Sequence, residues 1–495
     1  MYLLNRDTFQ KGARRVRNRV SVYKIKIEEE LVVGSRPVKE ATILHAMIPI
    51  VILVASLSYA ILVHEAAPHI PLIVGTIVAA AVAVFMLGTP WDELEEGMRS
   101  TLSATLQAIL ILMIVGALIG LWILSGTIPV MIYYGLQILS PAVFLPAAFI
   151  ICCIVSLATG TSWGTAGTVG IALTGIGIGL GMPAGMVAGA VVSGAYFGDK
   201  LSPLSDTTNL APAMTGSSLF PHIKHMLYTS IPAFAISLVL YAVLGMRFAG
   251  KELDVERINV ILDALRANFT MSPLLLIPPL VVILLIAMKI PALPGLIGGS
   301  VLGGIFAAIF QGASSGDIIS AAHYGFEIES GVAVVDRLLN RGGLDGMMWT
   351  VALIICALTF GGVMEKTGML RAIGTKLFAM AKTTGSLVLS TVVSCIAVNI
   401  LAADQYLAIV LPGRLYKEEY AKRDLAPKNL SRVLEGAGTV TSALIPWNTC
   451  GAFMMATLGV SPLVYLPYAF LNLLLPAINV IYGYTGFSMA KVADE

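Results

Sequence analysis

Apolar residues follow one another in long runs along most of the chain, and short polar stretches separate the runs. A run of about 20 apolar residues is long enough to cross a bilayer as a helix. Two apolar regions, 141–180 and 384–412, contain polar residues in their middles, so each is either two full spans or one re-entrant hairpin with its tip at membrane depth. Uninterrupted spans are predicted near residues 43–63, 70–88, 103–124, 226–247, 272–289, 293–311, 348–364 and 463–484.

Two further apolar runs, about 186–210 and 433–457, contain polar residues in their second halves. The first includes GDKLSPLSDTTN at 198–209, and the second includes LIPWNTCG at 444–451. Each of these segments contains a proline, which cannot continue the hydrogen-bond ladder of a helix. Backbone that leaves helical geometry at membrane depth is tolerated where it lines a cavity. Both runs are therefore predicted to be unwound helices within an all-α polytopic membrane protein.

Landmarks in the first half of the chain recur in the second half at one spacing. At a shift of 242 residues (448 − 206), Gly126, Ser162 and Asp206 fall on Gly368, Asp404 and Asn448. The shared spacing predicts an internal repeat. Its predicted parts are a first unit at 41–247, a connecting loop at 248–271 and a second unit at 272–484.

The distribution of basic residues predicts how the two units are oriented. No Lys or Arg occurs between Thr101 and Asp199, whereas Lys and Arg are frequent on both sides of 384–412. Because cytoplasmic loops collect basic residues, the hairpin at 141–180 is predicted to open outward and the hairpin at 384–412 to open inward. Two hairpins that open to opposite faces indicate an inverted repeat. The basic tail at 1–40 and the tail at 485–495 are then both cytoplasmic.

Composition excludes an ordinary soluble protein. Hydrophobic residues make up 57% of the chain and charged residues 12%, against about 25% charged residues in soluble domains. The five cysteines show no metal-ligand spacing, and no phosphate loop, zinc motif or nucleophile elbow is present. The sequence therefore predicts no enzyme, no resident cofactor and no nucleic-acid partner.

The strongest candidate for chemistry is Asp206. A carboxylate in a spanning segment costs several kcal/mol unless it is paired or hydrated. Asp206 lies beside Ser205, Thr207 and Asn209, and this set of carboxylate, hydroxyl and amide oxygens suits a hard cation such as Na⁺. A carboxylate can also exchange the cation for a proton. The alternative is a solvated loop between two spans.

The hairpin tips and the second unwound helix supply further candidate ligands. Asp404 and Gln405 lie at the predicted tip of the second hairpin, where Asp404 either binds an ion or caps a helix N-terminus. Hydroxyls at the first tip either bind an ion or belong to a tight turn only. The candidates in these segments are Thr159, Thr161, Ser162, Asp404, Gln405, Asn448 and Thr449.

Two more acidic residues are candidates for carrying the coupled proton. Asp199 precedes Asp206 by seven residues, close to the same helix face, and either pairs with Lys200 or has a direct proton role. Glu435 lies early in a predicted span and is either interfacial or a proton site. The proton-coupling candidates are Asp206, Asp404, Asp199 and Glu435.

Two motifs carry a resemblance to a known family. The segments GTSWGTAGT at 160–168 and FGDKLSPLSDTTNLAP at 197–212 resemble the NhaC-type sodium/proton antiporters, within the wider ion-transporter superfamily. The resemblance implies a scaffold domain, a mobile transport domain and a Ser-Asn-Thr signature at each unwound helix. This chain has Ser205-Asp206-Thr207 and Trp447-Asn448-Thr449 there. Members of the family also exchange organic acids, so the resemblance does not fix the substrate.

The resulting hypothesis is a secondary transporter that exchanges Na⁺ for H⁺ by alternating access across a bacterial cytoplasmic membrane. The alternative is a carrier that couples Na⁺ or H⁺ to a small organic anion or an amino acid. The expected partners are Na⁺, H⁺ and the lipid bilayer, and a homodimer is an open alternative.

Overall fold

The computed structural model describes residues 38–492 apart from 65, 249–254 and 380. The predicted basic tail at 1–40 lies almost wholly outside the described residues, as do the last three residues. Within the described part, two isolated β-bridges are the only extended pairing and the rest of the ordered structure is helical. Eight of these helices are long and apolar enough to cross a membrane, or ten if each of two bent pairs is one span. The all-α polytopic prediction is confirmed.

The first half of the chain forms helices that are interrupted at two places. Four residues separate α9 from α10, and α6 is followed by a short helix and a π-helical stretch, η2. The elements are α2 (Ile43–His64), α3 (His69–Ala81), η1 (Val82–Leu87), α4 (Trp91–Leu124), α5 (Thr127–Ile138), α6 (Pro141–Thr159), α7 (Ser162–Thr165), η2 (Ala166–Gly170), α8 (Ile171–Gly179), α9 (Ala184–Leu201), α10 (Asp206–Thr215) and α11 (Leu219–Met246).

The second half repeats these interruptions. The stretch expected as a connecting loop contains α12 (Val255–Asn268), which the 3₁₀ turn η3 (Pro273–Leu276) joins to α13 (Ile277–Ala287). The other elements are α14 (Ala292–Gln311), α15 (Ser315–Tyr324), α16 (Ala333–Leu339), α17 (Gly343–Gly346), α18 (Met348–Lys366), α19 (Met369–Phe378), α20 (Thr384–Leu401), α21 (Gln405–Lys422), α22 (Pro427–Val433), η4 (Leu434–Thr439), α23 (Val440–Ser442), α24 (Thr449–Leu458), α25 (Pro462–Tyr465), η5 (Leu466–Tyr468) and α26 (Phe470–Thr485).

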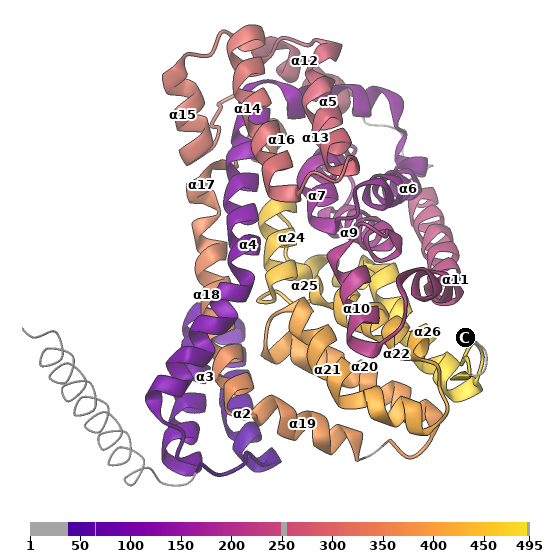
Figure 1. The fold of residues 1–495 in the computed structure, drawn as a ribbon. Coiled ribbons are helices and arrows are strands. Elements are labelled where there is room, and N and C mark those ends of the chain that lie inside the picture. Colours follow the sequence, from indigo (N-terminus) through magenta and orange to yellow (C-terminus); the bar gives the residue numbers. More distant parts are fainter. Residues whose placement is uncertain (1–37, 65, 249–254, 380, 493–495) are drawn as a thin grey trace, which may run out of the picture.

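The helices form two groups that lie side by side in Figure 1. Helices α2, α3, α4, α14 and α18 pack on one another in the column on the left, while α6, α9, α11, α20, α21 and α26 pack together on the right. Small residues allow close approach within each group, as is usual for membrane helices. A Cβ at Gly198 of α9 would lie 2.6 Å from the Cys153 carbonyl oxygen of α6, so only glycine fits there.

The repeat is visible as matched helix caps. Thr161 and Asp404 are N-caps whose side chains accept a hydrogen bond from the backbone N–H three residues later. Ser205 and Asn448 are N-caps of α10 and α24, and both helices end at a left-handed glycine, Gly216 or Gly459. These pairs differ by 243 residues (404 − 161, 448 − 205, 459 − 216). The sequence pairing of Ser162 with Asp404 and of Asp206 with Asn448 is therefore wrong by one residue.

The physical reason for this error is that the caps are chemically equivalent without being identical. Thr and Asp cap a helix equally well through a side-chain oxygen, and so do Ser and Asn. Gly126 and Gly368, the left-handed N-caps of α5 and α19, keep the shift of 242. The second half has thus gained one residue between Gly368 and the tip of its hairpin.

Candidate functional site

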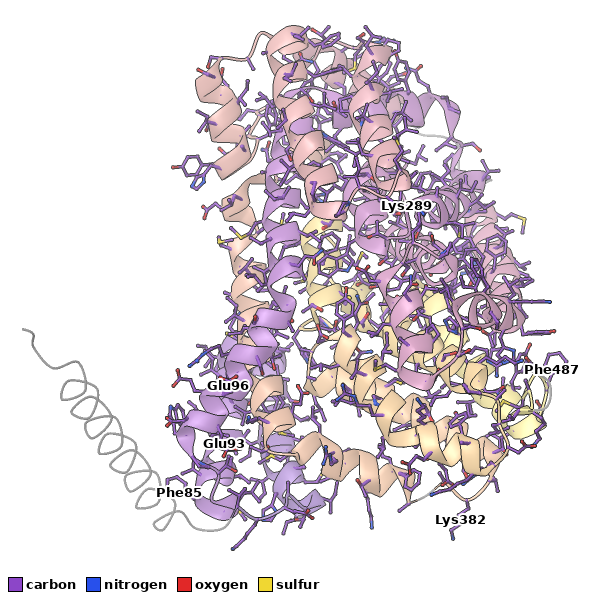
Figure 2. The ribbon with its side chains drawn as sticks, viewed as in Figure 1. Phe85, Glu93, Glu96, Lys289, Lys382 and Phe487 are labelled. Carbon is purple, nitrogen blue, oxygen red and sulfur yellow. The ribbon has the colours of Figure 1, made fainter. Side chains whose placement is uncertain are left out.

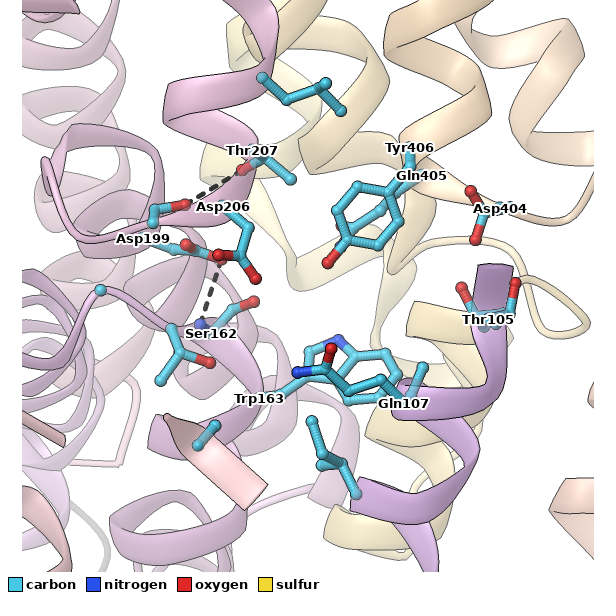
Figure 3. Close-up of a pocket in the computed structure, with 18 of the residues that line it drawn as sticks. Thr105, Gln107, Ser162, Trp163, Asp199, Asp206, Thr207, Asp404, Gln405 and Tyr406 are labelled. Carbon is cyan, nitrogen blue, oxygen red and sulfur yellow. Dashed lines mark hydrogen bonds between the residues drawn. The ribbon is translucent and has the colours of Figure 1, made fainter. Parts of the chain in front are cut away.

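A cavity of about 1130 Å³ lies where the two groups of helices meet (Figure 3). Residues of α4, the end of α13 and Glu365 of α18 line one side of it. The other side is formed by the interrupted segments: the tip between α6 and α7, the break between α9 and α10, the start of α21 and the start of α24. Every helix break that the sequence predicts as functional therefore borders this one space.

The break between α9 and α10 replaces its lost helical hydrogen bonds with side-chain bonds. The Ser205 hydroxyl accepts a hydrogen bond from the Thr208 backbone N–H (3.4 Å), and the Thr208 hydroxyl donates to the Asp199 carbonyl oxygen (3.1 Å). Such bonds satisfy the backbone groups that a helix terminus leaves free. The break is thereby held in a defined shape, with Asp206 as the first residue of α10.

The Asp206 carboxylate is open to the cavity. It lies across the cavity from Tyr406, and the two side chains point into the space between them (Figure 3). Its position in the first turn of α10 is favourable because a helix N-terminus attracts negative charge. Asp206 is thus neither in a loop outside the fold nor enclosed by apolar groups, since it faces a polar space inside the protein.

The predicted ligand Asn209 does not reach this space. Its side-chain amide folds back along its own helix and donates to the carbonyl oxygens of Pro203 (3.0 Å) and Ser205 (2.7 Å). It stabilises the break from behind and does not line the cavity. Asn209 was expected beside Asp206 because sequence proximity suggested it, but the free carbonyl oxygens of the break take up its amide.

The tip of the first hairpin holds Asp199. Gly160 has a positive φ of 70° and ends α6, and Thr161 then caps α7. The backbone N–H of Ser162 donates to the Asp199 Oδ2 atom at 3.1 Å, a bond drawn in Figure 3. Thr159, Thr161 and Ser162 all line the cavity. The tip therefore does more than turn the chain, because it orients a buried carboxylate.

The predicted ion pair between Asp199 and Lys200 is wrong. The Lys200 ammonium group is fully buried and donates to the Ser230 hydroxyl at 3.1 Å. Consecutive residues of a helix do not face each other. The two side chains consequently leave α9 in different directions, and Asp199 turns toward the cavity.

The tip of the second hairpin brings Asp404 and Gln405 to the opposite wall of the cavity (Figure 3). Asp404 is 4% exposed, and its Oδ1 atom accepts a hydrogen bond from the Leu407 backbone N–H at 3.0 Å. The expected capping role of Asp404 is confirmed, and the same residue lines the cavity. The Gln405 Oε1 atom is buried and has no hydrogen-bond partner among the described residues, so it is available to a ligand.

Asn448 and Thr449 hold the second unwound helix against this tip. The Thr449 backbone N–H donates to the Ala403 carbonyl oxygen at 2.9 Å, and Thr449 lines the cavity. The Asn448 amide donates to the Asn399 Oδ1 atom at 3.1 Å and lies behind the cavity wall. Asn448 is therefore placed to position the wall from behind. Its counterpart in the first half is Ser205, and the next residue there, Asp206, faces the cavity.

Glu435 also lies behind the wall and connects to it through one bond. It is fully buried in η4, and its Oε1 atom accepts a hydrogen bond from the Thr207 hydroxyl at 2.9 Å. Thr207 itself lines the cavity. Its complete burial among helices means that Glu435 faces neither lipid nor bulk solvent.

Sequence reasoning missed the wall that α4 contributes. The polar residues of this wall lie on α4, and Figure 3 labels two of them, Thr105 and Gln107. The full set is Ser100, Thr101, Thr105 and Gln107. The repeat of Thr101 and Thr105 at helical spacing, where an apolar run begins, was a usable signal. Trp163 was also missed; its ring stacks on Phe453 with centroids 4.1 Å apart.

The cavity is acidic. Four carboxyl groups line it, on Asp199, Asp206, Glu365 and Asp404, whereas Lys289 is the one basic residue among the described residues that line it. A cavity with walls of low dielectric and one sign of charge concentrates ions of the opposite sign. Within the described residues, no three His, Cys, Asp or Glu side chains meet at one point. A cation in this cavity would consequently combine a carboxylate with hydroxyl and carbonyl oxygens.

Comparison with known proteins places the chain among transporters. A family model described as "Na+/H+ antiporter family" matches residues 194–487. The chain is 41% identical over 454 residues to the Na⁺/H⁺ antiporter NhaC of Alkalihalophilus pseudofirmus, which covers 92% of this chain and 98% of the relative. It is 42% identical over 400 residues to the malate-2H⁺/Na⁺-lactate antiporter of Bacillus subtilis, which covers 81% and 86% of the two chains. It is 38% identical over 455 residues to the arginine/ornithine antiporter ArcD of Halobacterium salinarum, which covers 92% and 94%. The chain therefore belongs to the Na⁺/H⁺ antiporter family.

Proposed function

We propose that this protein exchanges Na⁺ for H⁺ across the membrane in which it resides. The observation that carries the proposal is the acidic cavity, in which oxygens freed by broken helices surround Asp206 between two groups of helices. Carboxylate, hydroxyl and carbonyl oxygens are the ligands that hard cations prefer. The relatives named as Na⁺/H⁺ antiporters, with sequence identity along nearly the whole chain, support the same conclusion.

Competition at shared carboxylates would enforce exchange. Asp206 is open to the cavity and binds either Na⁺ or a proton, so one ion must leave before the other binds. Ser205 and Thr207 on α10, with the hydroxyls of the opposite tip, would complete the Na⁺ ligands. Asp199 and Asp404 would keep the cavity negative and are further proton-coupling candidates.

Movement of the two helix groups past each other would expose the cavity to alternate sides. The cavity lies at the boundary of the two groups. Each broken helix either belongs to the group that contains α6, α9, α20 and α21 or packs against that group. In this proposal the column of α4, α14 and α18 is the scaffold, and the other group carries the site. We further propose a bacterial cytoplasmic membrane as the location, with both termini in the cytoplasm.

The test is Na⁺-driven proton movement in proteoliposomes. The variant Asp206→Asn keeps the shape of the side chain and removes its ionisable oxygen, so Na⁺-driven dissipation of a pH gradient is expected to fall at least about 100-fold, the loss of a charged ligand. The matched control is Asp263→Asn on α12, whose side chain is 75% exposed and does not line the cavity. Unchanged exchange by Asp206→Asn, at equal insertion, contradicts the proposal.

A second candidate function is exchange of a small organic solute, and two observations favour it. The cavity of about 1130 Å³ is slightly larger than the usual range of small-molecule pockets, about 300–1,000 Å³. Lys289 at the end of α13 lines it and would pair with a carboxylate of such a solute (Figure 2). Relatives named as malate–lactate and arginine–ornithine antiporters show that the family includes such exchangers.

The two candidates differ in the effect of Lys289. Uptake of labelled dicarboxylates and amino acids is measured with the wild-type protein and with Lys289→Gln. If an organic acid is the cargo, Lys289→Gln abolishes its counterflow. If Na⁺ is the cargo, no labelled solute accumulates and Lys289→Gln still exchanges Na⁺.

A further inference from the structure

Thr207 joins the cavity to a carboxyl group that the cavity does not contain. Its side chain lines the cavity and is 3% exposed. Its Oγ1 atom lies 2.9 Å from Glu435 Oε1 and 3.2 Å from the Ser205 hydroxyl oxygen. A hydroxyl has one hydrogen to donate and two lone pairs to accept with. The direction of its single hydrogen therefore depends on the state of Glu435.

Glu435 is incompletely satisfied in its buried position. Its Oε2 atom is buried without a hydrogen-bond partner among the described residues, and so is the hydroxyl of Thr439, one turn later in η4. Within the described residues, Thr207 is thus the one side chain whose hydroxyl donates to this carboxyl group at hydrogen-bond distance, and the Thr439 hydroxyl is the other neutral group that acts on it. A buried carboxylate with so few donors gains much by taking up a proton.

The groups around Glu435 allow it to change its charge. Asp199 and Lys200 of α9 interact with it electrostatically, and Arg432 of α22 and His222 of α11 act on Lys200. The remaining neighbours of η4 present uncharged groups to it. The Asn399 amide of α20 donates to the Gly438 carbonyl oxygen, and α10 contributes Thr207. Ala408 and Ile409 of α21 lie against Gly438, and Asn479 of α26 lies against Gly436. Lys200 is fully buried and makes no ion pair within 4 Å in the described structure, so it offsets the charge of Glu435 without fixing it.

We propose that the Thr207 hydroxyl is a two-position switch that makes cation binding in the cavity depend on the protonation of Glu435. The inference rests on the proposed Na⁺/H⁺ exchange and adds a proton site that has no direct contact with the transported ion. Thr207 is in this respect a positioning residue, because it transmits the state of Glu435.

When Glu435 is ionised, Oε1 is a strong acceptor and the Thr207 hydrogen points to it. The lone pairs of Thr207 are then free to face a cation beside Asp206. When Glu435 takes up a proton, Oε1 becomes a weaker acceptor or a donor, and the Thr207 hydrogen is released. A hydrogen that turns toward the cavity opposes a cation there. Protonation behind the wall thus lowers cation affinity in front of it.

The switch predicts two coupled protons for each cation, one at Asp206 and one at Glu435. By linkage, each coupled proton weakens apparent Na⁺ affinity by up to about tenfold for each unit of acidification. The measurement is Na⁺/Na⁺ counterflow in proteoliposomes, at equal pH on both sides, as a function of Na⁺ concentration at several pH values. In the wild type, affinity is expected to fall by more than about tenfold for each pH unit over part of the range.

Thr207→Val removes the hydroxyl while it keeps the shape of the side chain. Because this change also removes a proposed Na⁺ ligand, counterflow is expected to need more Na⁺ at every pH, and the pH dependence of the apparent Na⁺ affinity is expected to fall to at most about tenfold for each unit. Thr207→Ser restores the steep dependence. The matched control is Thr215→Val at the other end of α10, whose buried hydroxyl donates to the Pro212 carbonyl oxygen of its own helix. This control is expected to keep the wild-type profile.

A double-mutant cycle with Glu435→Gln tests whether the two residues act as a unit. If they do, Glu435→Gln and the double variant both show the reduced dependence of Thr207→Val. A wild-type profile in Thr207→Val, or effects that add in the double variant, overturns the switch while Na⁺/H⁺ exchange stands. Absence of any Na⁺ counterflow in the wild-type protein overturns both. The Val and Ser variants decide the question by themselves if the Glu435 variant does not fold.

Discussion

At the scale of single residues, three aspartates in one cavity differ because their surroundings differ. Asp206 is open to the cavity, Asp199 is held by the backbone of the first hairpin tip, and Asp404 caps α21 while it lines the opposite wall. A side chain open to a polar space can exchange its partner easily, whereas a side chain that satisfies a helix terminus is held in place. On this ground we propose that Asp206 exchanges ligands while Asp199 and Asp404 set the charge of the cavity.

The two roles of Asp404 can be separated by substitution. Asn caps a helix as well as Asp does, so Asp404→Asn is expected to change the free energy of unfolding by only a few tenths of a kcal/mol, whereas Asp404→Ala costs about 1 kcal/mol. Both variants are expected to lose most Na⁺-driven proton movement because they remove a carboxylate from the cavity. Thermal unfolding in detergent and proteoliposome exchange are measured together. Full exchange by Asp404→Asn would show that Asp404 is a cap only.

At the scale of secondary-structure elements, the site depends on close contact between broken helices. Gly160 ends α6 in a left-handed conformation, and a Cβ there would lie 2.6 Å from the Leu204 Cβ and 2.9 Å from the Leu204 backbone carbon. The tip of the first hairpin therefore packs directly on the break that carries Asp206. At the second hairpin, Ala403 also has a positive φ, and the backbone of Ala402 touches Gly361 of α18.

A pair of glycine substitutions tests this contact. Gly160→Ala and Gly312→Ala both place alanine in a left-handed conformation, which costs about 1–2 kcal/mol. Gly312, at the end of α14, has nothing within 4 Å of an added Cβ. Gly160→Ala must in addition displace the backbone at Leu204. We expect Gly160→Ala to lower the unfolding temperature more than Gly312→Ala does and to abolish exchange; equal effects of the two substitutions would contradict the proposed contact.

At the scale of the whole molecule, the cavity lies at the boundary between two groups of helices, and matched interruptions in the two halves approach it. In Figure 1, α6 and α7 lie in the upper part of the right-hand group, and α20 and α21 lie in its lower part. Hairpins that reach a common site from different ends are what an inverted repeat requires. The membrane sidedness of these hairpins, and the unit boundaries at 41–247 and 272–484, stay predictions.

Cysteine labelling tests the predicted sidedness. Ser218 in the turn before α11 is predicted to be cytoplasmic, and Ser315 at the start of α15 is predicted to be external; both serines are exposed. An impermeant maleimide applied to intact cells is expected to label Ser315→Cys and to label Ser218→Cys only after the membrane is opened. The unsubstituted protein, whose cysteines are mostly buried, gives the background. Labelling of both variants from the same side would reject the inverted arrangement.

The sequence alone determined the membrane class, the broken helices and the polar cluster around Asp206. These follow from local causes: apolar run length sets the spans, and proline with short polar side chains ends a helix wherever it occurs. The tertiary structure decided which residues share the cavity. It removed Asn209, added a polar stripe of α4, and joined Thr207 to Glu435, which lies 228 residues away along the chain. It also corrected the spacing of the repeat by one residue, because Thr161 and Asp404 have the same capping role although their residue types differ. Contacts between distant elements depend on how helices pack, and the spacing of residues along one element does not determine that packing.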